Sequence, residues 1–312
     1  MNNPLLEAFK TPFSTLPFDQ IEAVHFLPAI EDQIAATRKE IETICQNTAE
    51  ASFENTLEAL EKSGKRLGII SGALFNLNSA ETNAALQEVT QKAAPLLTAL
   101  QNDIRLNTQL FERIKSVYEA DQSNLIPEQK TLLEKEYKAF VRNGALLNEA
   151  EKTSLRTIDQ ELAQLSLQFG ERVLDDTNAF SMLLTKEEEV AGLPESTLAM
   201  AKQLAEVDGK EGWKFTLDYP SYVPFMTYAD NRALRKKMSL AFGKRGFQAN
   251  KNNNEETVLK IVQLRHQRAN LLGYPSHAAF VLEERMAKDE ATVRAFLSDL
   301  QEKAAPKAKE EW

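Results

Sequence analysis

The sequence predicts a mainly α-helical protein with a small β insertion near residues 179–218. Glycine supplies only 11 of the 312 residues, whereas roughly 7% is usual. Because glycine is the residue that enters tight turns most easily, this scarcity disfavours a fold built from many hairpins. Several long stretches also place apolar residues at steps of three and four, which is the period of an amphipathic helix.

The clearest of these stretches lies between residues 148 and 175. Asn148 and Glu151 stand three residues apart at its start, as in a capping box. Just upstream, Pro127 suits the first position of another helix and Gly144 suits its left-handed end. Along the stretch runs an apolar stripe that we expect to be buried, formed by Leu155, Ile158, Leu162, Leu165, Phe169 and Val173.

Further helices are expected near residues 28–46, 53–77, 79–105 and 107–120. Ser52 or Asn55 is expected to cap the second, and Asn107 with Thr108 to separate the third from the fourth. Pro95 lies inside the third helix, which it should kink or split. Because the segments differ in length and apolar pattern, they predict an irregular multi-helix bundle rather than a regular solenoid.

The pattern changes after Asp175. Two short apolar or alternating runs, 180–185 and 213–218, predict strands of a small sheet. The polar insert from Gly243 to Asn254 has the composition of a mobile loop, and helical spacing returns at Glu255. Ser276 and Asp289 are expected to cap two further helices.

These patterns divide the chain into two expected regions. Residues 1–150 form an amino-terminal helical lobe, and residues 151–312 hold the long helix, the β insertion and further helices. Residues 304–312 still read as an unfinished helix at the end of the sequence.

Charge and composition exclude several classes of partner. The formal net charge is −9, and no basic block is longer than residues 235–237, so a nucleic-acid partner is not expected. No apolar run approaches the roughly 18 residues that span a bilayer, and no signal peptide is recognisable, so we expect no membrane partner. With a single cysteine, Cys45, the composition fits a reducing compartment, and the expected location is the cytoplasm.

No known catalytic motif is present. The three histidines, His25, His266 and His277, do not form His-Glu-x-x-His, in which two imidazoles one helical turn apart bind zinc. Gly-x-Ser-x-Gly and the glycine-rich phosphate loops are also absent. Cys45 is expected to be a buried apolar group. The residues alone therefore give no catalytic, cofactor-binding or metal-binding position.

The densest polar and aromatic group lies between residues 219 and 245. It comprises Tyr219, Tyr222, Tyr228, Arg232, Arg235 and Arg245. One interpretation is that the tyrosines pack a junction while the arginines pair with carboxylates; the alternative is a surface that contacts peptides. The run 283–285, Glu-Glu-Arg, is expected to be a solvated helix face.

Short motifs spread along the chain resemble the amino-terminal part of bacterial peptidyl-dipeptidases, which belong to the thimet oligopeptidase and oligopeptidase A family of zinc metallopeptidases. The motifs cover essentially all 312 residues, although none is catalytic. They are Asn3-Pro-Leu-Leu6, Leu16-Pro-Phe-Asp-Gln-Ile21, His25-Phe-Leu-Pro-Ala29, the run Phe53 to Gly64, Ala80-Glu-Thr-Asn83, Leu264-Arg265, Ala269 to Tyr274, Ser276-His-Ala278 and Val281 to Ala287.

The resemblance implies a two-lobed, mostly helical enzyme that cleaves short unstructured peptides in a deep channel, releasing carboxyl-terminal dipeptides in the peptidyl-dipeptidase branch. It implies zinc held by His-Glu-x-x-His in a carboxyl-terminal catalytic half, which would be the missing partner of this chain. We therefore expect an inactive amino-terminal fragment that shapes the channel and binds no zinc itself. The alternative is a stand-alone helical scaffold or peptide-binding module without catalysis.

Overall fold

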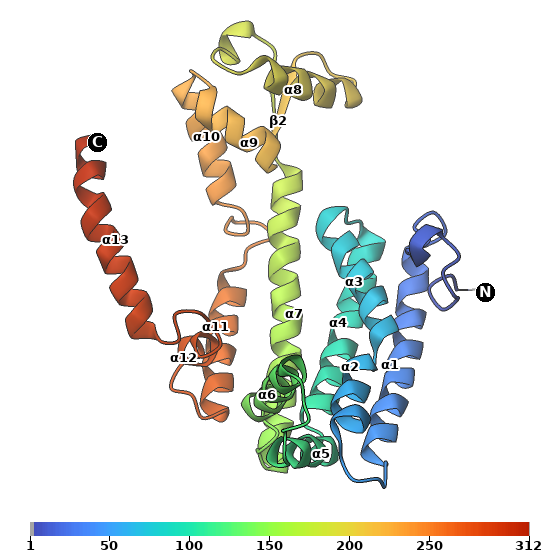
Figure 1. Cartoon of the computed structure of the whole chain (residues 1–312). Coiled ribbons are helices and arrows are strands. Elements are labelled where there is room, and N and C mark those ends of the chain that lie inside the picture. Colours follow the sequence, from blue (N-terminus) through green and yellow to red (C-terminus); the bar gives the residue numbers. More distant parts are fainter. Residues whose placement is uncertain (1–2, 312) are drawn as a thin grey trace. The chain divides into compact units, whose positions relative to one another are not determined.

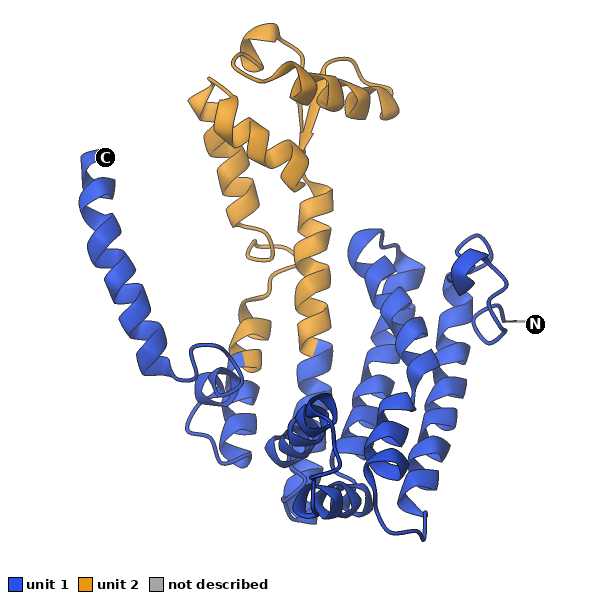
Figure 2. Ribbon diagram, viewed as in Figure 1, with its two compact units in different colours: residues 1–164, 262–312 blue, residues 165–261 orange. Residues whose placement is uncertain are grey.

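A computed structural model describes residues 3–311, and within them the fold is mainly α-helical, as predicted. The chain divides into two compact units (Figure 2). The first unit contains residues 1–164 and 262–312, and the second contains residues 165–261. The boundary expected at residue 150 remains a prediction. Among the described residues, no helix is both long and apolar enough to cross a lipid bilayer.

The first unit begins with a series of helices joined by short connections (Figure 1). They pack around two apolar clusters, one centred on Phe26 and Leu74 and the other on Phe111 and Phe140. The elements are a short 3-10 turn at Pro12–Ser14, α1 (Ala23–Cys45), a π-helical turn (Phe53–Glu58), α2 (Ala59–Lys62), α3 (Lys65–Ala80), α4 (Ala84–Arg105), α5 (Thr108–Glu119) and α6 (Pro127–Arg142).

The predicted helix at 53–77 is broken in the structure. Ser63 is extended, with ψ of 148°, and Gly64 takes a left-handed φ of +64°, a conformation that glycine adopts without steric cost. The start is as expected, because the Ser52 hydroxyl accepts the Asn55 amide at 3.2 Å. In contrast, α4 is not split at Pro95, which lies inside one continuous helix.

Helix α7 (Glu149–Ala179) is the long helix that the sequence predicts. Its capping box is present: the Asn148 side chain accepts the Glu151 amide and the Glu151 carboxylate accepts the Asn148 amide, both at 3.0 Å. The expectation of a fully buried stripe is wrong. Only Leu155 is buried, and Phe169 is 38% exposed. The second half of α7 belongs to the second unit, where polar residues of the loop before α11 contact it.

The second unit contains the small β insertion. Its strands, β1 (Ser181–Leu184) and β2 (Trp213–Thr216), pair antiparallel, with Ser181 opposite Thr216. A short 3-10 turn at Glu187–Glu189 and helix α8 (Glu195–Val207) lie between the two strands in the chain, and helices α9 (Tyr219–Tyr228) and α10 (Arg232–Gly243) follow β2. The core of this unit surrounds Phe215 and Phe225, whose rings meet edge to face at 4.8 Å.

The chain returns to the first unit through α11 (Glu255–Leu271), followed by α12 (His277–Leu282) and α13 (Glu290–Glu311). The two predicted caps are present. Ser276 Oγ accepts the Ala279 amide at 3.0 Å, and Asp289 Oδ1 accepts the Thr292 amide at 2.7 Å. Helix α13 continues to residue 311, and Trp312 lies outside the described residues.

Candidate functional site

A buried carboxylate on α7 organises the polar part of the second unit. Asp176 is only 5% exposed. Its Oδ1 accepts hydrogen bonds from the side-chain amides of Asn252 and Asn250, at 2.8 and 3.1 Å. Its Oδ2 accepts the Gly246 backbone amide at 2.8 Å and the Gln248 side chain at 3.2 Å. All four donors belong to the loop between α10 and α11, so this loop is anchored and the expectation of a mobile loop is wrong.

Two opposing effects act on the Asp176 carboxyl. Burial acts to raise its pKa, whereas the hydrogen bonds from Asn252, Gly246, Asn250 and Gln248 favour the charged form, and the pKa lies below its ordinary value. A carboxylate that is charged and fully hydrogen-bonded at neutral pH is a poor proton shuttle. Asp176 therefore acts as a structural anchor.

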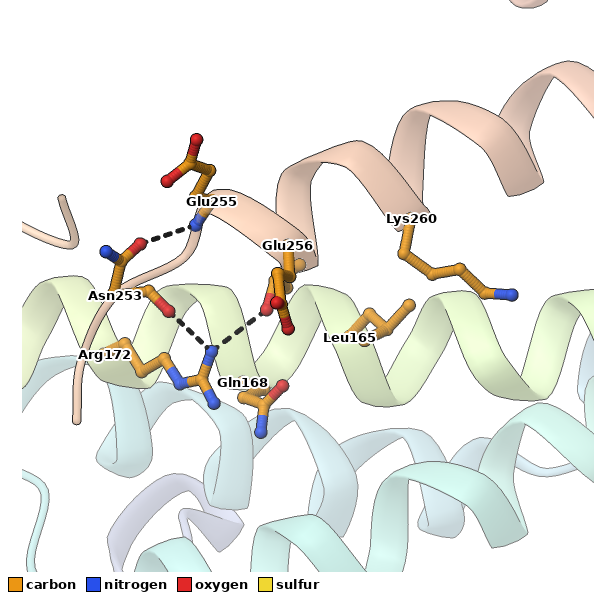
Figure 3. A pocket seen from close by; sticks show the side chains of 8 residues that line it. Leu165, Gln168, Arg172, Asn253, Glu255, Glu256 and Lys260 are labelled. Atoms are coloured by element: carbon orange, nitrogen blue, oxygen red, sulfur yellow. Dashed lines mark hydrogen bonds between the residues drawn. The ribbon is translucent and has the colours of Figure 1, made fainter.

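One helical turn before Asp176, Arg172 lies at a pocket of about 540 Å³ inside the second unit (Figure 3). Its Nη1 donates to the Asn253 carbonyl at 2.9 Å and to the Thr257 hydroxyl at 3.0 Å, and so ties α7 to the start of α11. The pocket is lined by Leu165, Gln168, Arg172, Asn253, Glu255, Glu256, Thr257 and Lys260.

The pocket carries both signs of charge. Arg172 and Lys260 supply two cations, and Glu255 and Glu256 supply two carboxylates. Such a lining suits a polar ligand with groups of both charges, such as a segment of peptide. It holds no histidine or cysteine that could serve as a nucleophile or base. The arrangement can hold a polar ligand through ion pairs and hydrogen bonds.

The polar and aromatic group of residues 219–245 is only partly brought together. Tyr222 stacks on Phe242 with ring centroids 4.1 Å apart, and the Arg245 guanidinium lies 3.6 Å from the same ring. Arg245 Nη1 also donates to the Thr177 hydroxyl at 3.1 Å. The tyrosine stacking matches the packing interpretation, but Arg245 packs on a ring and donates to a hydroxyl and a carbonyl, so it does not show the expected pairing with a carboxylate.

The remaining members of the group lie apart from this stack or at its edge. Tyr219 meets Phe242 edge to face at 5.9 Å and is 69% exposed. Arg235 donates to the carbonyls of Ala229 and Asp230, where α9 ends. Tyr228 is 53% exposed. The exposed tyrosines leave a peptide-contacting surface as an untested prediction.

The three histidines have separate structural surroundings. His25 Nδ1 accepts the Glu22 amide at 3.0 Å in the cap of α1, and His266 Nε2 lies 3.0 Å from the Asn270 side-chain amide. Burial, followed by the nearby charges of Arg265 and Arg268, lowers the pKa of His277. The surroundings of each histidine ring are therefore explained by the helix or connection to which it belongs.

Cys45 is half-buried, and burial is the largest cause of the raised pKa of its thiol. A raised thiol pKa lowers the fraction of the reactive thiolate at neutral pH. The sulfur lies 3.8 Å from Asn107 Oδ1, the atom that also caps α5. The expectation of a buried apolar group is therefore met only in part, because the side chain is half-buried, although the raised thiol pKa disfavours reactivity.

Sequence reasoning missed a buried arginine in the first unit. Arg142, with a side chain 9% exposed, pairs with Glu283 and donates to the Phe280 carbonyl at 2.6 Å. The Tyr274 hydroxyl also donates to Glu283, at 2.6 Å, and Lys138 pairs with Glu284. The run 283–285 is therefore not simply a solvated helix face, because its first two carboxylates fasten α12 to α6.

The described residues do not fit a zinc site. Across residues 3–311, no three His, Cys, Asp or Glu side chains gather closely enough to hold a metal ion. A zinc site of the type implied by the resemblance would need ligands that this part of the chain does not bring together.

Comparison with known proteins gives the family. Residues 225–312 match peptidase family M3. Oligopeptidase A of Salmonella typhimurium is 34% identical over 316 residues, an alignment that covers 100% of this chain and 46% of the relative. Dipeptidyl carboxypeptidase of Escherichia coli is 31% identical over 311 residues, covering 99% of this chain and 46% of the relative.

The chain belongs to peptidase family M3. Saccharolysin of Saccharomyces cerevisiae is a more distant relative, 28% identical over 83% of this chain. The chain spans about half the length of the curated M3 relatives that it matches. The M3 match begins in α9 and includes the anchored loop and α11 to α13, whereas Arg172 and Asp176 precede it.

Proposed function

We propose that the chain is one half of a zinc metallopeptidase that hydrolyses short peptides. The observation that carries this proposal is the 34% identity to oligopeptidase A over the whole chain, although the chain corresponds to only 46% of that enzyme. The 312 residues contain no His-Glu-x-x-His. In the proposal, zinc is held by the carboxyl-terminal catalytic half of the longer protein, where it would polarise the scissile carbonyl and activate water.

The role proposed for this chain is to shape a channel for short unstructured peptides. The helices of residues 1–150 would form one wall of that channel. The pocket at Arg172 supports a peptide contact, because its two cations and two carboxylates suit a ligand that carries both charges. The chain alone would be inactive, since it lacks the ligands that zinc-assisted hydrolysis requires.

The test compares this 312-residue chain with the product of the complete reading frame. We expect only the longer protein to bind zinc and to cleave a quenched short peptide, and a chelator should abolish the cleavage. Metal-dependent cleavage by the purified 312-residue chain would contradict the proposal. If neither protein cleaves, the stand-alone scaffold becomes the better interpretation.

The finer proposal is that dipeptides are released from the carboxyl end of the substrate. It draws on the similarity to dipeptidyl carboxypeptidase. The chain is 31% identical to that protein, which is nearly the 34% identity that it shares with oligopeptidase A. A pair of peptides with the same sequence, one with a free carboxylate and one amidated, separates the two modes. The longer protein should cleave the free acid much faster; equal rates would indicate an endopeptidase.

A further inference from the structure

Helix α13 carries an apolar face that the first unit leaves uncovered. Val293, Phe296, Leu297 and Leu300 recur at i, i+3, i+4 and i+7, which places them on one side of the helix. We call these four residues the α13 face. Phe296 is 63% exposed, Leu297 56% and Leu300 46%, and no described residue of α13 is buried.

The carboxyl-terminal half of the helix carries charged side chains that pair with one another. Lys303 pairs with Asp299 at 2.7 Å, and Lys307 pairs with Glu310 at 2.8 Å. The helix packs mainly against α12, from which it extends as a single rod (Figure 1). An amphipathic helix in a protein gains most of its stability from packing its apolar side.

The contrast with the earlier helices of the same unit is sharp. In α5, Leu110, Phe111 and Ile114 have the same three-and-four spacing and are at most 2% exposed. Both helices belong to the first unit, and α5 shows that this unit covers a stripe of this kind where other helices pack against it. Helix α13 lies within residues 225–312, the segment that matches family M3, and the chain accounts for only 46% of oligopeptidase A.

We propose that the α13 face is the docking surface for the other half of the same peptidase. This inference rests on the proposed function for the existence of that half, and adds the surface through which this chain holds it. The 312-residue chain alone exposes the face, and the longer polypeptide covers it.

A second copy of this chain is the less fitting occupant. Four side chains of one helix offer much less than the roughly 800 Å² per partner that a stable interface between separate proteins buries. A segment joined to the same polypeptide needs no such area, because the covalent connection gives it a high effective concentration.

The experiment places one substitution in two chain lengths. Leu297→Asp is introduced into the 312-residue chain and into the product of the complete reading frame, and the thermal unfolding midpoint of each is measured. Ala295→Asp is the matched control, because Ala295 lies on the opposite side of α13 and is also exposed. We expect Leu297→Asp to lower the midpoint of the longer protein by at least about 2 °C, with little change in the shorter chain and little effect of Ala295→Asp in either.

Each alternative outcome is distinguishable. If Leu297→Asp stops the longer protein from folding, the milder Leu297→Ser should lower its midpoint measurably. Equal effects in the two lengths, no effect in either, or a reading frame that ends at residue 312 would overturn the inference. So would a concentration-dependent dimer of the shorter chain that Leu297→Asp dissociates, since this would identify a second copy as the occupant.

The stability comparison does not depend on catalysis. A longer protein that shows the length-dependent effect but cleaves no peptide would retain the docking surface and refute the proposed peptidase. A longer protein that cleaves peptides but tolerates Leu297→Asp would retain the peptidase and refute the docking surface.

Discussion

The aromatic cluster between α5 and α6 and the loop between α10 and α11 are both ordered, but by opposite means. In the cluster, Tyr118 stacks on Tyr137 with centroids 4.0 Å apart, and Phe140 is fully buried beside Phe111. The loop has no such core and is held by hydrogen bonds to one buried carboxylate, Asp176. A segment that is ordered by apolar packing shows regularly spaced apolar residues in its sequence. A segment that is ordered by hydrogen bonds to one distant acceptor shows no such pattern.

The largest expected effect is in the aromatic cluster between α5 and α6. Phe140→Ala should lower the free energy of unfolding of the 312-residue chain by about 3–5 kcal/mol, because it removes a buried ring and leaves a cavity. Urea unfolding followed by circular dichroism measures the change. Leu146→Ala is the control, since Leu146 is 69% exposed and its truncation should cost little.

Asp176→Ala should be the next largest. It leaves the buried Asn252 amide and the Gly246 amide without their acceptor, at a cost of about 2–4 kcal/mol in the second unit. The fluorescence of Trp213, on β2 in that unit, reports the transition. Asp175→Ala is the matched control. Equal losses from the two substitutions would show that the loop is not held by Asp176.

The pH dependence of this anchor has a defined sign. Because the pKa of Asp176 in the folded chain lies below its ordinary value near 3.8, the stabilisation is fully present above that value and is lost as pH falls through the folded pKa. The stability difference between wild type and Asp176→Asn should therefore be constant from about pH 8 to 5 and shrink below about pH 4. A difference that grows on acidification would contradict the assignment.

A smaller effect is expected at the glycine that lets the loop approach α7. Gly246 has φ of +69°, and an added Cβ would lie 2.9 Å from Asn254 Nδ2 and 3.0 Å from Val173 Cγ2. Gly246→Ala should cost about 1–2 kcal/mol. Gly243→Ala is the control, because its Cβ would meet nothing within 4 Å, and it should be neutral or slightly stabilising.

The smallest expected effect concerns His277. Its lowered pKa means that the folded chain takes up a proton less readily than the unfolded chain, so stability falls as pH drops below the ordinary histidine value near 6.5. Between pH 7.5 and 5.5, the wild type should lose slightly more of its thermal midpoint than His277→Gln does. Parallel losses would show that neither burial nor the charges of Arg265 and Arg268 lower the pKa of His277 in the folded chain.

Most of the fold could be predicted from the sequence where structure is local. Helix starts were predictable at Ser52, Asn107, Asn148 and Ser276, because each places a side-chain acceptor beside amides only two or three residues away. The strand at Trp213–Thr216 was predictable from its alternation, and the strand at Ser181–Leu184 from a short apolar run without helical spacing. The break at Gly64 was missed, because the apolar spacing continues across it and only the backbone conformation reveals it.

The candidate site was less predictable because its contacts are long-range. Asp176 and Asn252 are 76 residues apart in sequence, and nothing near Asp176 distinguishes it from its neighbour Asp175. One signal was present: a loop rich in asparagine amides is also rich in hydrogen-bond donors, for which a buried carboxylate is a natural acceptor. The polar composition of the loop indicates mobility only as long as its buried acceptor, Asp176, is not known.

The long reach of Arg142 has a consequence for synthesis of the chain. The Phe280 carbonyl that it contacts lies 138 residues further along the sequence. At ribosomal speeds of about 5–20 residues per second, Arg142 is therefore synthesised roughly 7–28 seconds before this acceptor is made. During that interval the amino-terminal helices can pack their own core, while the Arg142 guanidinium still lacks the Phe280 carbonyl and the Glu283 carboxylate that hold it in the complete chain.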